Sequence, residues 1–348
     1  MDRLKKLVRP HILKIKPYSS ARDDFKGSAE VYLDANENPY GAVTGGDFNR
    51  YPDPHQTKLK EVLSKIKGVS PNQIFIGNGS DEPIDLLIRA FCEPTKEKIV
   101  ILPPTYGIYK VSALINNVGV LEIPLTSSFQ IDTEQLKKTS FDNCKIIFIC
   151  SPNNPSGNLL NRQTIIEILE EFKGLVVVDE AYIDFAQESS LIETLKKYTG
   201  LIVLQTFSKA WGLAAIRLGI AYGNPYVIGI LNNIKPPYNI NRASQDMGIK
   251  ALEVESLKKE VVEKIVIERK RLGEKLRALQ FVKEVIPSRA NFLLVRFDNS
   301  EGINSFFREK NIIVRDRSGE LHCEGCLRIT IGTRVENDRL IQALNELL

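Results

Sequence analysis

The residues that could do chemistry in this chain follow short apolar segments in its middle. They are, in chain order, the glycine-rich turn GNGSDE (77–82), Tyr106, Asn154, Asp179 with Tyr182, and Ser208 and Lys209 with Arg217. These groups offer a turn that could hold a phosphate at a helix N-terminus, an aromatic ring, an amide, a carboxylate, a primary amine and a guanidinium. In an open α/β sheet, ligands bind beyond the carboxyl ends of the strands, so we expect the groups to meet at one sheet edge.

Each of these residues also has a structural interpretation without function. Asp179 could cap a helix, Asn154 before proline could form a turn, and Lys209 could be a solvated loop residue. Their joint occurrence at successive strand ends favours a common site.

Pyridoxal phosphate is a cofactor that uses all of these groups. It needs a lysine amine for its Schiff base and a carboxylate on its pyridine nitrogen, which Lys209 and Asp179 could supply. Asn154 and Tyr182 could donate to its 3′-oxygen, and Tyr106 could stack on its ring. The residues available for its phosphate are Gly79, Ser80, Ser208 and Arg217.

The segments that must position these residues alternate between strand-like and helix-like patterns. Seven short runs are rich in Val and Ile without polar alternation, as is typical of strands buried on both faces. They are Ile74–Ile76, Lys98–Leu102, Val118–Ile123, Lys145–Cys150, Leu175–Val178, Leu201–Leu204 and Leu218–Tyr222. Amphipathic segments lie between them, which predicts an α/β fold with a mostly parallel seven-stranded sheet.

The pattern changes near residue 245 and indicates a second domain. Residues 245–279 read as one long charged helix, and three strand candidates follow at 291–297, 312–315 and 326–331. We therefore expect an N-terminal arm and part of the small domain (1–44), a large cofactor-binding domain (45–245), and an interdomain helix with a small α+β domain (246–348). The basic start of the chain lacks the apolar stretch of a secretory signal and predicts a solvated helix or arm.

Composition narrows the classes of function. The chain has 348 residues, 43% hydrophobic and 26% charged, which excludes a wholly disordered protein. The net charge of +4 gives no support to a nucleic-acid or membrane-surface role. Five cysteines form no disulfide framework and predict a reducing, cytoplasmic compartment. Cys323 and Cys326 form C-x-x-C, but no second ligand pair accompanies them, so we expect no metal.

Several motifs resemble those of the fold-type-I pyridoxal-phosphate aminotransferases, namely PNNPSG, VDEAY and SKAWGLAAIRLG. Others are similar to one branch of that family, the histidinol-phosphate aminotransferases: YLDANENPYG, RYPDP, GNGSDE, KPPYN, ANFLLVRF, IIVRDR and CLRITIGT. The resemblance covers about residues 9 to 348, with the motifs in family order.

The resemblance implies a role for each matching residue. Lys209 would be the Schiff-base lysine and later the proton carrier, and Asp179 would pair with the pyridine nitrogen. The other cofactor-binding residues implied are Gly79, Ser80, Asp81, Tyr106, Asn154, Tyr182, Ser208, Arg217, and Tyr51 from the partner subunit. The substrate-binding residues implied are Tyr18, Asn36, Arg315 and Arg328. Two arginines fit a substrate phosphate well, although Arg315 could instead be a surface charge.

The resemblance also implies a homodimer with a shared active site and a transamination. L-Histidinol phosphate and 2-oxoglutarate would be interconverted with imidazole-acetol phosphate and L-glutamate, in histidine biosynthesis. The sequence leaves three alternatives: an aromatic amino-acid aminotransferase of the same family, a pyridoxal-phosphate decarboxylase of a phosphorylated amino acid, and a non-catalytic cofactor-binding regulator. The last lacks support, because the chain has no appended DNA-binding segment.

Overall fold

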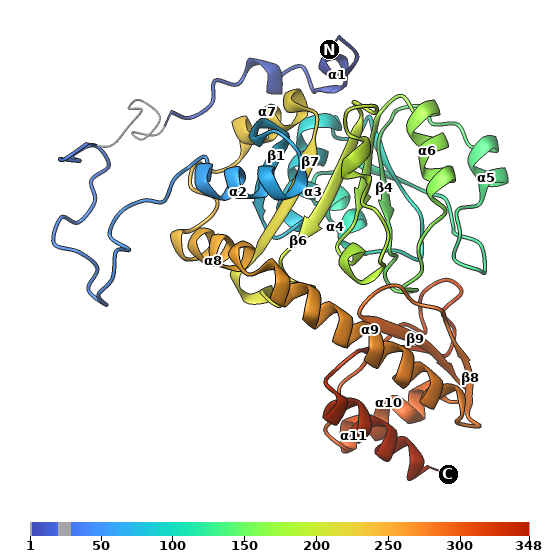
Figure 1. Cartoon of the computed structure of the whole chain (residues 1–348). Helices are drawn as coiled ribbons and strands as arrows, with labels where there is room; N and C mark the ends of the chain where they lie inside the picture. Colours follow the sequence, from blue (N-terminus) through green and yellow to red (C-terminus); the bar gives the residue numbers. More distant parts are fainter. Residues whose placement is uncertain (1, 20–28, 348) are drawn as a thin grey trace.

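The larger of two sheets organises the middle of the chain (Figure 1). The computed structural model describes residues 2–19 and 29–347. Seven strands lie in the order β1-β7-β6-β5-β4-β2-β3. They are β1 (Ile74–Asn78), β2 (Lys98–Ile101), β3 (Gly119–Glu122), β4 (Cys144–Cys150), β5 (Leu175–Asp179), β6 (Leu201–Thr206) and β7 (Leu218–Gly223). Only β7 runs against its neighbours β1 and β6, which confirms the predicted mostly parallel sheet.

Both faces of this sheet are covered, which explains the unbroken apolar strands. In β5, Val176 and Val178 pack into one core, whereas Leu175 and Val177 pack into the other. The first core includes side chains of α2 (Thr57–Lys67), α6 (Arg162–Glu171) and α8 (Arg242–Glu253). The second includes side chains of α3 (Asp81–Phe91), α4 (Ile108–Ile115) and α7 (Pro225–Ile234). A short helix, α5 (Thr133–Lys138), lies at the periphery of this domain (Figure 1).

The first helix, α1 (Asp2–Leu7), packs on the larger domain. Leu4, Val8 and Ile12 are buried in its second core, although only Leu4 lies within α1 itself. The guanidinium of Arg3 donates to the carbonyl of Phe172 at 2.7 Å. The expected solvated helix or arm is a short surface helix and an arm: most other described side chains up to residue 19 are exposed, and the described contacts of this part are with the larger domain. The proposed division of the chain at residues 45 and 246 stays a prediction.

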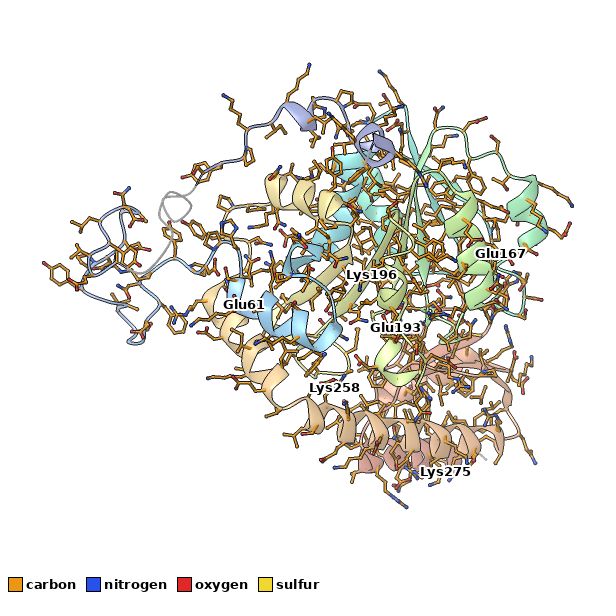
Figure 2. All side chains as sticks on the ribbon, turned by 45° about the horizontal axis from the view of Figure 1, so that its top comes forward. Glu61, Glu167, Glu193, Lys196, Lys258 and Lys275 are labelled. Atoms are coloured by element: carbon orange, nitrogen blue, oxygen red, sulfur yellow. The ribbon has the colours of Figure 1, made fainter. Side chains whose placement is uncertain are left out.

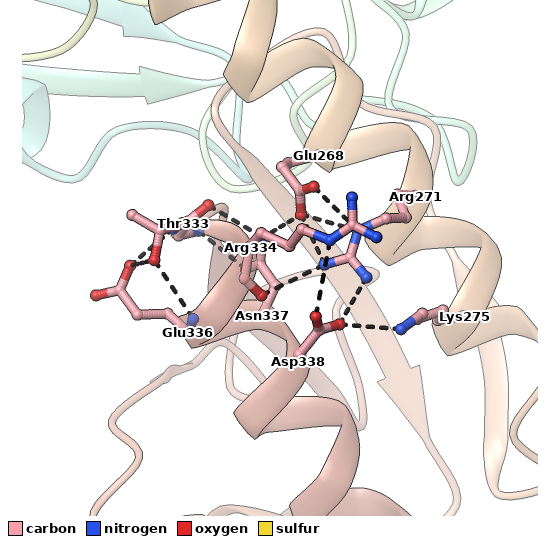
Figure 3. Close-up of polar contacts among 9 residues, drawn as sticks. Glu268, Arg271, Lys275, Thr333, Arg334, Glu336, Asn337 and Asp338 are labelled. Atoms are coloured by element: carbon pink, nitrogen blue, oxygen red, sulfur yellow. Dashed lines mark hydrogen bonds and ion pairs between the residues drawn. The ribbon is translucent and has the colours of Figure 1, made fainter.

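The smaller sheet has four antiparallel strands in the order β10-β11-β9-β8. They are β8 (Val282–Val285), β9 (Phe292–Phe297), β10 (Arg315–Asp316) and β11 (Cys326–Thr330). Three helices share a core with it: α9 (Glu255–Arg277), α10 (Ser300–Glu309) and α11 (Arg334–Asn345). An ionic network joins α9 to α11, in which Arg271 contacts Glu268 at 2.7 Å and Asp338 at 2.6 Å (Figure 3).

The structure differs from the sequence predictions at three places in this region, and one is the strand predicted at 312–315, of which only Arg315 belongs to a strand, β10. The segment 245–279 forms two helices, α8 and α9, because Val254 leaves the helical conformation with φ −115° and ψ 37°. Neither glycine nor proline marks this break, so the local sequence gives no signal for it. Strand β8 was not predicted, since its two central side chains are exposed and its sequence is half charged.

Helix α9 ties the two domains together. Lys258, labelled in Figure 2, projects from its first turns and forms an ion pair with Asp184 at 2.8 Å. The same ammonium lies 4.7 Å from the centre of the Trp211 ring. Asp184 and Trp211 both lie close in sequence to predicted site residues, so these contacts fix loops at the site. Among the described helices, none is long and apolar enough to cross a membrane.

Candidate active site

A cavity of about 240 Å³ lies at the carboxyl ends of β4, β5 and β6. Ten of the residues predicted from the sequence line it: Ser80, Asp81, Tyr106, Asn154, Asp179, Tyr182, Ser208, Lys209, Arg217 and Arg328. The parallel order of these strands brings the residues together, because their carboxyl ends share one sheet edge. Arg328 comes from β11 of the smaller sheet, so the cavity lies between the two domains.

Asp179 is the buried charge of the site. It ends β5 and is only 2% exposed. The Tyr109 hydroxyl donates to its Oδ2 at 2.7 Å, and the Ala181 backbone N–H donates to its Oδ1 at 3.0 Å. Burial raises the pKa of Asp179, and the two hydrogen bonds oppose that rise. A carboxylate desolvated in this way favours a cation at short range.

Lys209 lies in the loop after β6, with its amine toward the cavity. Its Nζ is 5.6 Å from the centre of the Tyr182 ring. Part of the side chain remains exposed. Desolvation and then the positive charge of Arg328 lower the pKa of the Lys209 amine. A lowered pKa increases the share of the neutral amine, which is the form that acts as nucleophile and base.

Gly79 and Arg217 form a cradle at the N-terminus of α3. The Gly79 backbone N–H donates to the Arg217 carbonyl at 2.7 Å, and Gly79 has a φ of +73° that favours glycine. A Cβ at Gly79 would lie 2.6 Å from Nη2 of Arg217, so a side chain there would displace this guanidinium. Arg217 also forms an ion pair with Asp81 at 3.2 Å. Backbone N–H groups at a helix start and a guanidinium together suit a phosphate.

Aromatic and amide groups complete the walls of the cavity. The Tyr106 hydroxyl donates to Asp81 Oδ1 at 3.2 Å, and burial raises the pKa of Tyr106. Arg328 donates to the side-chain oxygen of Asn154. Tyr182 packs edge-on against Phe292 with ring centres 5.2 Å apart. These contacts orient an aromatic ring, an amide and a phenol around one space.

Of the predicted residues in the described chain, five do not line this cavity, and Gly79, next to Ser80, is one of them. Tyr18 is 74% exposed, and Arg315 is exposed on β10, directly across the strand pair from Arg328. Asn36 lies in the N-terminal arm with a φ of 54°. Tyr51 stacks on Tyr238 with ring centres 4.5 Å apart.

The structure adds two residues that sequence reasoning missed. Tyr109 is fully buried, stacks on Phe148 at 4.8 Å and holds Asp179. Its position three residues after Tyr106, at the start of a helix, was the available signal. Arg317 lines the cavity beside Arg328. Arg317 is the last residue of the motif IIVRDR, so the motif that holds Arg315 was the available signal for it.

Cys323 and Cys326 lie outside this cavity. Both thiols are buried and free, and burial raises their pKa to about 12 and about 11. Such thiols stay protonated at neutral pH and are poor nucleophiles.

Comparison with known proteins identifies the family. Residues 21–344 match the sequence model of "Aminotransferase class I and II". The chain belongs to the class I and II aminotransferase family. A "Histidinol-phosphate aminotransferase" from Cytophaga hutchinsonii is 51% identical over 341 residues, covering 98% of each chain. A protein of the same description from Parabacteroides distasonis is 49% identical over 347 residues, covering 100% of this chain and 99% of the relative.

Solved structures of several aminotransferases share this fold. The histidinol-phosphate aminotransferase from Clostridium acetobutylicum is similar with a TM-score of 0.80 and 28% identity, covering 86% of this chain and 91% of that one. An L-threonine-O-3-phosphate decarboxylase from Porphyromonas gingivalis has a TM-score of 0.74 at 23% identity, and the match covers 86% of this chain and 91% of that one. Because that likeness shows the fold alone, the fold does not by itself choose between transamination and decarboxylation.

Proposed function

We propose that this aminotransferase interconverts L-histidinol phosphate and 2-oxoglutarate with imidazole-acetol phosphate and L-glutamate, a step of histidine biosynthesis. The observation that carries the proposal is one cavity that combines a buried carboxylate, an amine of lowered pKa and a cluster of arginines. The relatives near 50% identity over the full chain bear the same activity in their descriptions.

The cofactor is pyridoxal phosphate, and the residues of the cavity fit it. When bound, it supplies a carbonyl that accepts the amino group and a ring that accepts electron density from the reacting carbon. Gly79, Ser80, Ser208 and Arg217 would hold its phosphate, with Asp81 fixing the arginine. The Asp179 carboxylate would pair with the pyridine nitrogen and keep that nitrogen protonated. The residues proposed for the remainder of the ring are Tyr106, Asn154 and Tyr182.

Lys209 would hold the cofactor covalently and then move the proton. Its Nζ, freed when the substrate amine arrives, removes the proton from the substrate carbon that bears nitrogen, and later returns a proton to complete the transfer. The lowered pKa of Lys209 suits this, because the neutral amine must accept that proton. Asp179 keeps its charge fixed throughout, since Tyr109 and Ala181 hold both of its oxygens.

Arg328 and Arg315 would bind the anionic end of the substrate. Arg328 lines the cavity, and Arg315 pairs with it across the two strands. Two guanidinium groups match a phosphate better than a single carboxylate does. Tyr18 and Asn36 are proposed to line the substrate side. This arrangement distinguishes a phosphorylated substrate from an aromatic amino acid.

A panel of amino donors on the purified holoenzyme tests this function. We expect kcat/KM for L-histidinol phosphate with 2-oxoglutarate to exceed that for L-phenylalanine by about a hundredfold or more, because the aromatic substrate lacks the phosphate contacts. Equal efficiencies would support the aromatic aminotransferase instead. Release of carbon dioxide from L-threonine phosphate without a 2-oxo acid would support the decarboxylase. Binding of the cofactor without turnover of any of these substrates would support the non-catalytic, cofactor-binding regulator.

We also propose that two copies of the chain share each active site. The arm exposes large apolar side chains, with Leu33 89% exposed, Tyr40 97% and Val43 100%. Exposed apolar residues grouped in one segment indicate a surface that another chain covers. Tyr51 would reach the cofactor phosphate of the partner.

The charge balance and free cysteines suit the cytoplasm, the compartment that we propose.

Complementation between two inactive variants tests the shared site. Tyr51→Ala and Lys209→Ala each remove one contribution to the site, so each homodimer should be strongly impaired. Mixed dimers should contain one site with both residues intact. After subunit exchange, we expect activity to rise toward one quarter of that of the wild type, the value for random pairing in which half the dimers carry one good site. Mass spectrometry measures the exchange. Exchange without recovered activity would contradict the proposal.

A further inference from the structure

Arg317 is a second arginine of the cavity, two residues beyond Arg315. Its backbone N–H donates to the Cys326 carbonyl at 2.9 Å, which continues the pairing of β10 with β11. Arg317 lies one residue beyond the end of β10 (Arg315–Asp316), opposite Cys326 of β11. Arg317 and Arg328 line the cavity, whereas Arg315 is exposed.

The side chain of Arg317 is held in place but not fully paired. Its Nη1 contacts Glu320 Oε1 at 2.6 Å, and the side chain is only 20% exposed. Its Nε is buried and has no hydrogen-bond partner in the described part of the chain. A buried donor without an acceptor costs free energy, so an acceptor that reaches Nε is favoured. Side-on binding through Nε and a terminal nitrogen is available to a guanidinium fork.

The charges near Arg317 favour an anion with more than one negative charge. Both guanidinium groups line the same cavity, and after burial the positive charge of Arg317 is the largest influence that lowers the pKa of Arg328. Glu320 balances only part of this charge. A phosphate carries close to two charges at neutral pH and three terminal oxygens, whereas a carboxylate offers one charge and two oxygens.

We propose that Arg317 binds the substrate phosphate together with Arg328 and sets the preference for a phosphorylated amine over its unphosphorylated counterpart. Glu320 acts as the orienting group that holds Nη1 and leaves Nε for the ligand. The inference rests on the proposed function, since it names the anionic group that the same cavity accepts. It adds to the role proposed for Arg315 and does not replace it.

The test compares L-histidinol phosphate with L-histidinol in holoenzyme variants. For Arg317→Gln we expect kcat/KM for the phosphorylated substrate to fall about 10- to 100-fold, mainly through KM, while that for histidinol changes less than about threefold. Inorganic phosphate, as a competitive inhibitor, should bind more weakly by a similar factor. Arg317→Lys keeps the positive charge but loses the forked guanidinium, so its kcat/KM for the phosphorylated substrate should lie between those of the wild type and Arg317→Gln.

The matched control is Arg334→Gln. Arg334 lies on α11, its side chain is 73% exposed, and it contacts Asp338 in the network of Figure 3. We expect it to leave both efficiencies unchanged. If kcat/KM of Arg317→Gln fell equally for histidinol or for glutamate, the specificity role would be overturned. The same holds if its ratio of kcat/KM for histidinol phosphate to that for histidinol stayed within threefold of the wild-type ratio. If the wild type itself does not turn over histidinol phosphate, the proposed function fails instead, so the two failures are distinguishable.

Discussion

Replacing Lys209 by alanine is expected to reduce transamination by about four orders of magnitude or more, because one amine both holds the cofactor and moves the proton. The amine lies at the cavity, and burial together with Arg328 lowers its pKa, so no other described lysine lining this cavity can substitute for it. Steady-state rates with L-histidinol phosphate and 2-oxoglutarate measure the loss.

The fold of the Lys209→Ala variant should survive. The loop is anchored elsewhere, since Trp211 stacks on Phe207 with ring centres 5.2 Å apart and also contacts Lys258. The thermal midpoint of the cofactor-free protein should therefore stay within a few degrees of that of the wild type. Lys196→Ala is the matched control: this exposed lysine, labelled in Figure 2, lies outside the cavity. Near-normal turnover by Lys209→Ala would refute the assignment.

Asp179→Asn is expected to reduce the rate by about a hundredfold or more. A preorganised charge of this kind contributes roughly 3 kcal/mol or more to catalysis, and asparagine removes the charge while keeping the shape. Tyr109→Phe removes one hydrogen bond but keeps the carboxylate, so its loss should be smaller. A pH profile of the visible absorbance of the bound cofactor should shift in both variants.

The stability of Asp179→Asn provides the control for this prediction. In the cofactor-free protein, burial raises the pKa of Asp179 above that of the unfolded chain. A carboxyl group with a raised folded pKa favours folding when protonated, and this contribution is lost as the pH rises through the folded pKa. At neutral pH the ionised carboxylate therefore costs stability, and the thermal midpoint of Asp179→Asn should equal or exceed that of the wild type. A slow but destabilised variant would point to misfolding, and a loss under threefold would make Asp179 a structural cap.

Local sequence determined much of the larger domain. Strands such as Leu175–Asp179 are continuous apolar runs because helices cover both faces of the sheet, and such runs are visible without a structure. Polar residues that end or directly follow parallel strands, such as Asp179 after β5 and Asn154 after β4, lie at the ligand edge for the same topological reason. Ten of the predicted residues consequently line one cavity.

The local sequence predicted the elements of the smaller domain less well than those of the larger domain. Half of the residues of β8 are charged and exposed, so its local sequence does not predict a strand. The strand forms because it pairs with β9. The break at Val254 likewise has no local marker, and α9 leaves α8 there to reach both domains (Figure 1). In the arm, Leu4, Val8 and Ile12 are buried, and only the structure shows the core that receives them.

The sequence by itself determined the chemistry of this protein: an amine, a carboxylate and a phosphate cradle at successive strand ends, because strand order in a parallel sheet constrains where those ends meet. Only the tertiary structure decided which partners tune that chemistry. Tyr109 reaches Asp179 across 70 residues of sequence, and the pairing of β10 with β11 brings the segment that holds Arg317 beside the strand that holds Arg328. Such contacts depend on side-chain packing between distant segments, and residue types along the chain do not encode that packing locally.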